Sequence, residues 1–195
     1  MKLVCKGRFT GEEQLPKGDL PPDAVPYREP GTPQEVNRAA MVFLLPVLLF
    51  AVLLWVLRGL VQGTWLLSLQ WTAFAGMASS LLLIVPHELV HALCFPRGAV
   101  VELYLALKSG MAFVVSTHPL SKRHFIWMSL APSLLFGVAP LLVWALLPLR
   151  AETAAFLFWL GLMNLTMGIG DFMNVWNTLC QVPRGAMTQL SGFHS

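Results

Sequence analysis

Four long apolar segments, almost free of charge, restrict what this chain can fold into. They cover residues 39–57, 65–94, 125–149 and 153–179. The first has 19 residues without a charge, which as a helix rising about 1.5 Å per residue could cross a hydrocarbon core about 30 Å thick. Only 12% of the chain is charged, whereas soluble domains carry about 25%. The sequence therefore predicts an all-α integral membrane protein with about four transmembrane helices.

A polar arm precedes these segments. Residues 1–38 hold six of the 14 prolines and six of the 10 acidic residues. Proline disfavours long helices, so we expect an extended cytosolic arm, which also lacks the apolar stretch of a secretory signal. The expected organisation is this arm at 1–38, a polytopic membrane domain at 39–182 and a short cytosolic tail at 183–195.

The stretch between the second and third apolar segments has a different pattern. Glu102 and Tyr104 share one parity, and Val101 and Leu103 share the other. Turn-forming residues follow at 108–110, and residues 111–116 are rich in β-formers. This pattern predicts a β-hairpin between the second and third helices. The alternative is an irregular loop at the membrane surface.

The distribution of basic residues predicts the orientation. If four spans start from an inner N-terminus, eleven of the 13 Lys and Arg residues fall on the inner side. Basic residues accumulate in cytoplasmic loops, so both termini are predicted to be cytoplasmic. The end of the second span, near residue 91, then lies at the cytosolic face.

That end carries the most informative motif, His87-Glu88-Leu89-Val90-His91. On an α-helix, residues i and i+4 differ by about 40° in azimuth and about 6 Å in rise, so His87 and His91 could bind one metal ion. Glu88 would lie on the adjacent face, where it could take a proton from water. HExxH zinc hydrolases divide the work in this way. The alternative is a polar cluster that holds helices together.

A catalytic zinc needs a third protein ligand and an open fourth position. Asp171 is the strongest candidate, because it interrupts an otherwise uncharged segment and an unpartnered aspartate in lipid is costly. The alternatives for Asp171 are a helix cap or a pair with Arg184. Four further residues are weaker candidates for the third ligand: Cys94, Glu102, His118 and His124.

Composition also bears on partners and redox state. The net charge is +3, and there is no basic stripe with interleaved aromatic residues, so we expect no nucleic-acid partner. The three cysteines are far apart in the sequence and form no CxxC pair. We expect three free thiols.

Several short stretches together resemble a known family. They are "PHELVHAL" at 86–93, "LAP" at 130–132, "GD" at 170–171, "VPRGA" at 182–186, and the arm "LPKGDLPPDAVPYREP" at 15–30. The chain resembles the bacterial "putative zincin peptidase" family and is similar to the site-2-protease class of intramembrane metalloproteases. The resemblance implies Zn²⁺ held by His87, His91 and Asp171, with Glu88 as the catalytic base. It also implies a bacterial plasma membrane location and membrane-anchored peptide or protein substrates.

The predicted function is therefore an intramembrane zinc metalloprotease that hydrolyses peptide bonds of membrane-associated substrates near the cytosolic face. The alternative is a non-proteolytic membrane protein with a structural, binding or transport metal site. A third possibility is a helix-packing protein that binds no metal.

Overall fold

The computed structural model describes residues 1–30, 32–65, 67, 69–107 and 110–192. The chain forms two compact units, each built from interleaved segments. Unit 1 comprises residues 1–31, 84–131 and 174–195, and unit 2 comprises residues 32–83 and 132–173.

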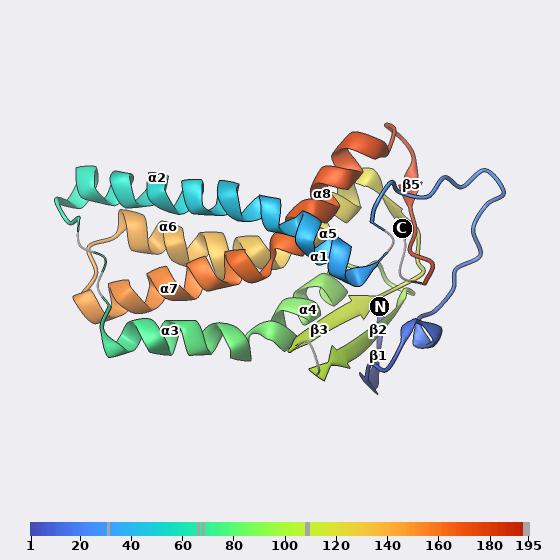
Figure 1. Cartoon of the computed structure of the whole chain (residues 1–195), viewed down its shortest axis with the longest axis horizontal. Helices are drawn as coiled ribbons and strands as arrows, with labels where there is room; N and C mark the ends of the chain where they lie inside the picture. Colours follow the sequence, from blue (N-terminus) through green and yellow to red (C-terminus); the bar gives the residue numbers. More distant parts are fainter. Residues whose placement is uncertain (31, 66, 68, 108–109, 193–195) are drawn as a thin grey trace. The chain divides into compact units, whose positions relative to one another are not determined.

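Unit 2 is helical. Its elements are α1 (Pro33–Ala40), η2 (Met41–Phe43), α2 (Leu44–Gln62), α3 (Trp71–Leu82), η4 (Ser133–Val138), α6 (Ala139–Leu146), α7 (Ala151–Met167) and the start of α8 (Ile169–Gln181). Helix α7 packs against α3 and α6, and α6 packs against α2, so these four helices run alongside one another (Figure 1). The core between them includes Leu141, Trp144, Phe158 and Leu165.

Small residues allow these helices to approach closely. A Cβ atom at Gly161 would lie 2.7 Å from the Leu141 side chain, and one at Gly76 would collide with the Phe156 carbonyl. One polar contact lies in the same packing, where the Asn164 amide donates to the Ser80 hydroxyl over 3.2 Å. Small residues and isolated polar bonds are how helices pack in lipid, where a hydrophobic driving force between helices is absent.

Within the described part of the chain, two helices are long and apolar enough to cross a membrane, Glu35–Gln62 and Lys122–Leu146. The number rises to four if each of two bent helix pairs counts as one span, namely α3 with α4 (Ile84–Leu93) and α7 with α8. On α2, leucines such as Leu45, Leu53 and Leu60 are 63–74% exposed, as expected for a surface that faces lipid. The four apolar segments of the sequence thus correspond to these four candidates.

The helix Lys122–Leu146 changes its winding midway. It starts as α5 (Lys122–Pro132), continues as the π-helical η4, and ends as α6. Pro132 lacks the N–H that an α-helix would use at this point. A local π-turn is a common way to accommodate such a break in the hydrogen-bond ladder.

Unit 1 contains a three-stranded sheet in the order β1-β2-β3. Strands β2 (Val100–Ala106) and β3 (Met111–Val115) pair antiparallel, with Tyr104 opposite Phe113. The predicted hairpin is therefore present, although residues 108–109 of its predicted turn lie outside the described residues. Strand β1 (Lys2–Arg8) pairs parallel with β2, with Leu3 opposite Val101.

The predicted all-α fold class is therefore wrong, and the fold is mixed α/β. Strand β1 comes from the arm, where seven residues with three basic side chains show no strong alternation. Its pairing partner lies almost 100 residues further along the chain. Parallel pairing of this kind needs a long crossover connection, so local pattern could not reveal it.

The two faces of this sheet have different coverings. Val101 packs with Ala92, Phe125 and Met128 on the side of α4 and α5. Tyr104, of opposite parity, packs with Leu15 and with residues of the C-terminal tail on the other face. The alternation predicted for β2 is thus confirmed, and both faces of the strand are buried.

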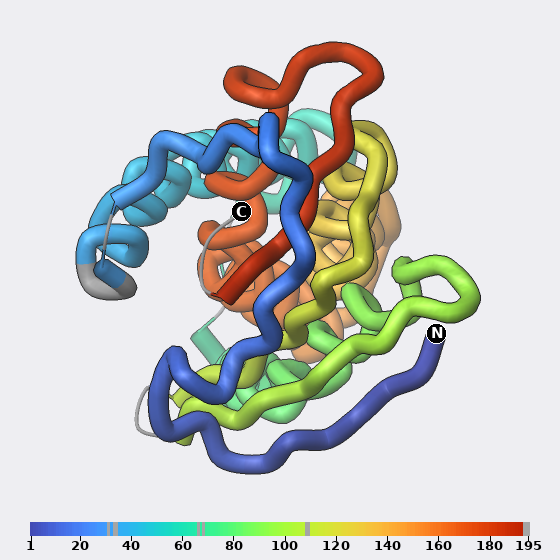
Figure 2. Tube along the Cα trace, turned by 90° about the vertical axis from the view of Figure 1, so that its right-hand side faces the viewer, coloured from blue at the N-terminus to red at the C-terminus, as the bar shows by residue number. Residues whose placement is uncertain are grey.

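The first 30 residues of the N-terminal arm are part of unit 1. The arm runs beside the C-terminal segment (Figure 2), where the Gly192 N–H donates to the Pro16 carbonyl over 3.0 Å. Further along, the Tyr27 hydroxyl and the Thr178 hydroxyl lie 3.1 Å apart. Two short strands, β4 (Leu120–Ser121) and β5 (Met187–Thr188), also pair in this unit.

Candidate metal centre

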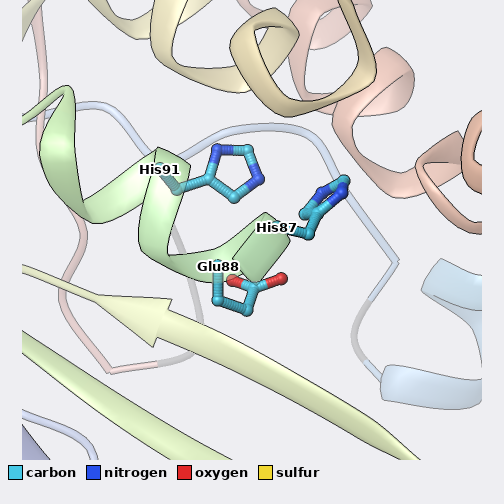
Figure 3. A group of neighbouring side chains, drawn as sticks. All are labelled: His87, Glu88 and His91. Atoms are coloured by element: carbon cyan, nitrogen blue, oxygen red, sulfur yellow. The ribbon is translucent and has the colours of Figure 1, made fainter. Parts of the chain in front are cut away.

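Helix α4 carries the HExxH motif in unit 1. The helix begins at Ile84, so Pro86 lies in its first turn, where a missing N–H costs little. The imidazoles of His87 and His91 extend from one side of the helix, and Glu88 extends toward β3 (Figure 3). Each of the three side chains offers a ligand atom, and these atoms lie within 4.8 Å of one another. The predicted constellation is therefore present as a cluster.

His91 is oriented by a backbone carbonyl. Its Nδ1 lies 2.8 Å from the Met128 carbonyl oxygen on α5, and the ring is only 7% exposed. A carbonyl oxygen can only accept, so Nδ1 donates, and in the neutral imidazole Nε2 then carries the lone pair. Metal-binding histidines are held in this way, with the second ring nitrogen donating to a carbonyl or carboxylate. The two rings of His87 and His91 have centroids 5.0 Å apart.

Glu88 is held by the sheet. The N–H of Val114 in β3 donates to Glu88 Oε2 over 3.0 Å. In the described part of the chain β3 pairs only with β2, so this N–H comes from the edge of the sheet that faces α4. The bond fixes one carboxylate oxygen of Glu88 beside the cluster.

The donor set fits a zinc ion. Zinc binds neutral imidazole nitrogens and carboxylate oxygens, and a catalytic site uses three protein ligands. His91 has the tautomer that such binding needs, and His87 places a second imidazole in the same cluster. The cluster is partly to fully buried, which lowers the local dielectric and strengthens electrostatic effects at the site.

Asp171 lies in the first turn of α8, within unit 2. A negative charge is favoured there by the helix dipole. Its backbone N–H donates to the Gly168 carbonyl over 3.0 Å. A Cβ atom at Gly168 would lie 2.5 Å from the Ser133 hydroxyl, so this glycine allows the close approach of the two segments. The role of Asp171 as third ligand stays a prediction.

The weaker ligand candidates have other partners or positions. Glu102 pairs with Lys6 at 3.1 Å and accepts from the Tyr104 hydroxyl at 2.6 Å, on the face of the sheet opposite Val101. His124 Nε2 donates to the Cys94 carbonyl. The thiol of Cys94 is free, and burial raises its pKa, which disfavours the thiolate that binds metals.

The backbone of His118 donates to the Ser116 hydroxyl. The cluster of ligand atoms found among the described residues consists of His87, Glu88 and His91. The cluster therefore contains none of the four weaker candidates for the third ligand.

Sequence reasoning missed the two backbone groups that orient the site. The Met128 carbonyl and the Val114 N–H have no side-chain signature, so no motif could indicate them. The β-rich residues 111–115 did predict a strand, but not which of its edges would face Glu88.

The cluster has the features of an HExxH metallopeptidase site: two histidines one helical turn apart, one with its tautomer set, and a glutamate beside them. The sequence model of the family described as "Putative zincin peptidase" matches residues 80–187, more than half of the chain. The chain belongs to this family. Comparison with curated proteins and with solved structures gives no match.

Proposed function

We propose that this protein is an intramembrane zinc metalloprotease that cuts membrane-anchored peptides or proteins near the cytosolic face. The observation that carries the proposal is the set tautomer of His91, whose Nδ1 donates to the Met128 carbonyl. A histidine that only packed or held helices together would not need a second imidazole and a carboxylate with ligand atoms within 4.8 Å.

His87 and His91 would hold the zinc ion, and Asp171 is proposed as the third ligand. Zinc, when bound, supplies a Lewis acid that polarises a peptide carbonyl and makes water more acidic. The two histidines rise from a single helix, so their spacing is set by the α-helical repeat.

Glu88 is proposed as the general base and then the general acid. With the carboxylate positioned by the Val114 N–H, Glu88 would accept the proton of the attacking water and return it to the leaving amine. The hydrogen bond also prevents rotation of the carboxylate away from the cluster. Positioned proton transfer of this kind contributes about 10²–10⁴ in rate.

The edge of β3 is proposed to bind the substrate. Backbone groups of alternate residues point the same way along a strand, so those of Ala112 lie on the same edge as those of Val114. An extended peptide could add to this edge as a further strand and run past Glu88. Such binding would recognise the backbone of the substrate peptide and would place the scissile bond next to Glu88.

Membrane insertion is proposed from the apolar helices and the basic residues. Two to four helices satisfy the length and composition of a span. Eleven of 13 basic residues would lie on the side of the N-terminus, which favours cytoplasmic termini. The HExxH motif would then act at the cytosolic face.

The test uses Glu88→Gln in the full chain. We expect cleavage of membrane-anchored peptides to fall by about 10²-fold or more, while the bound zinc stays at the wild-type level because both histidines remain. The readout is quantitative proteomics of membrane peptides in cells that express each form. Glu152→Gln, an exposed glutamate on α7, is the matched control and should behave as wild type. Equal peptide profiles for Glu88→Gln and wild type would instead favour a structural metal site.

A further inference from the structure

Unit 2 contains an open cavity of about 680 Å³ that is separate from the HExxH motif. It lies where α2 and α6 end and α7 begins. Its lining includes Arg58, Trp65, Gln70, Trp144, Ala154 and Phe158. The walls are thus largely aromatic and small apolar side chains, with one cation among them.

One wall is held in place by tryptophans. Trp55 donates its indole N–H to the Trp65 carbonyl over 2.9 Å, and the two rings meet edge to face at 5.5 Å. A Cβ atom at Gly59 would lie 2.5 Å from the Trp65 ring, so the glycine is required for this contact. The cavity wall is therefore formed by specific packing.

Arg58 is the charged group of this cavity and is only 6% exposed. One of its N–H groups donates to the Trp144 carbonyl, and the guanidinium carbon lies 5.1 Å from the centre of the Trp144 ring. No carboxylate pairs with it within the described residues. A guanidinium has five N–H donors, and among the described residues one carbonyl accepts from it, so it offers further donors to a ligand.

The contact with Trp144 accounts for only part of the burial of Arg58. Gln62, one turn after Arg58, donates to the Ala145 and Leu147 carbonyls at the end of α6. Arg58 and Gln62 together thus cap the C-terminus of α6. A neutral donor such as glutamine would suffice for that role, so capping does not account for a buried positive charge.

A second positive feature reaches the same cavity. Helix α7 starts at Ala151, its N-cap Arg150 makes no side-chain cap, and Ala151, Ala154 and Ala155 line the cavity. The first N–H groups of a helix lack internal partners and carry partial positive charge. Glu152 of the same turn is 51% exposed and is not among the lining residues.

We propose that this cavity binds the phosphate group of an anionic phospholipid. Arginine matches phosphate through paired hydrogen bonds, and helix N-termini favour phosphate. Tryptophans are enriched at the level of lipid headgroups. Exposed apolar residues beside the cavity, such as Leu60 on α2 and Leu146 on α6, offer a surface to acyl chains. The proposal does not depend on the peptidase function.

The test is a lipid titration of the full chain in uncharged detergent, followed by tryptophan fluorescence during heating. We expect dioleoylphosphatidylglycerol to raise the melting temperature in a saturable way. Arg58→Gln should lower the apparent affinity by about tenfold or more, because it removes a charged hydrogen-bond donor. Arg150→Gln removes the same charge from an exposed position at the same end of the unit and should leave the response unchanged.

Further arms separate the possible outcomes. Ala151→Trp adds bulk to the cavity from an exposed position and keeps Arg58 in the sequence, and it should abolish the lipid response even if Arg58→Gln folds poorly. Inorganic phosphate alone should give little shift, and a full shift would assign the cavity to a free anion and overturn the lipid proposal. An equal response to phosphatidylcholine would also overturn the proposal. So would a wild-type response of both Arg58→Gln and Ala151→Trp.

Discussion

The two compact units hold their functional groups in different ways. In unit 1, the side chains of the metal centre are oriented by backbone atoms, the Met128 carbonyl for His91 and the Val114 N–H for Glu88. In unit 2, close contact between helices depends on glycines such as Gly76 and Gly161. The orientation of the site residues therefore depends on a few directed hydrogen bonds. The packing of the helices in unit 2 depends instead on the shapes of the residues at their contacts.

This difference predicts that the two units respond differently to substitution. Changes in unit 1 should alter activity with little loss of stability if they affect only the orientation of a site residue. Changes in unit 2 should alter stability first.

Val114→Pro removes the N–H that holds Glu88. Proline is tolerated where the lost N–H faces away from the ladder, so β3 should still pair with β2. Loss of a hydrogen bond to a charged group costs about 1.5–3 kcal/mol, and we expect peptidase activity to fall by about ten- to a hundredfold. Zinc content should not change.

The matched control for that variant is Ala112→Pro, which alters the same edge two residues earlier. If the edge also binds substrate, Ala112→Pro should raise KM, while Val114→Pro should mainly lower kcat. Identical kinetics for Val114→Pro and wild type would show that Glu88 does not depend on this bond.

Gly76→Val tests packing in unit 2. The added side chain would collide with the backbone of α7 at Phe156, and overpacking of this kind costs about 1–3 kcal/mol. We expect a lower melting temperature, followed by intrinsic fluorescence, with zinc still bound below the transition. Ala78→Val, at an exposed position on the same helix, should leave the melting temperature nearly unchanged. A loss of zinc in folded Gly76→Val would break the contrast between the units.

A smaller effect is expected on how the stability of unit 1 depends on pH, through the buried phenol of Tyr104. Burial, the hydrogen bond to Glu102 and the negative charge of Glu102 together raise the pKa of Tyr104 to about 12. The unfolded value is about 10, so the folded state keeps this proton to higher pH. The stabilisation is complete below about pH 10 and is lost as pH rises toward about 12.

Ultraviolet difference spectra can follow the phenolate directly, since the chain has only two tyrosines. Subtracting the Tyr104→Phe spectrum from that of wild type isolates Tyr104 and removes the contribution of Tyr27. We expect a midpoint near pH 12. A midpoint near the unfolded value would show that neither the burial of Tyr104 nor its Glu102 contact persists in solution.

The sequence predicted the parts of this molecule that have a local signature. The apolar segments predicted the helices, alternation at Val101 and Tyr104 predicted the hairpin and its faces, and HExxH predicted the cluster on α4. It could not predict β1, because the pairing of Leu3 with Val101 is a contact between distant segments. This is why an all-α fold was expected where the structure has a sheet.

Local sequence patterns also could not predict the functional groups that belong to the backbone. The backbone atoms at Met128 and Val114 orient the site, and any residue type could supply the carbonyl and any except proline the N–H. Asp171 shows the opposite case, because its isolation in an apolar segment made it a candidate from sequence alone. Its position in the first turn of α8 also suits a helix cap, so the ligand role needs its own measurement.

The central claim is that His87 and His91 hold a catalytic zinc. Elemental analysis of the purified full chain in detergent tests it most directly. We predict about one zinc per chain for wild type and for His118→Ala, and almost none for the His87→Ala, His91→Ala double variant. Wild-type zinc content in the folded double variant would contradict the account.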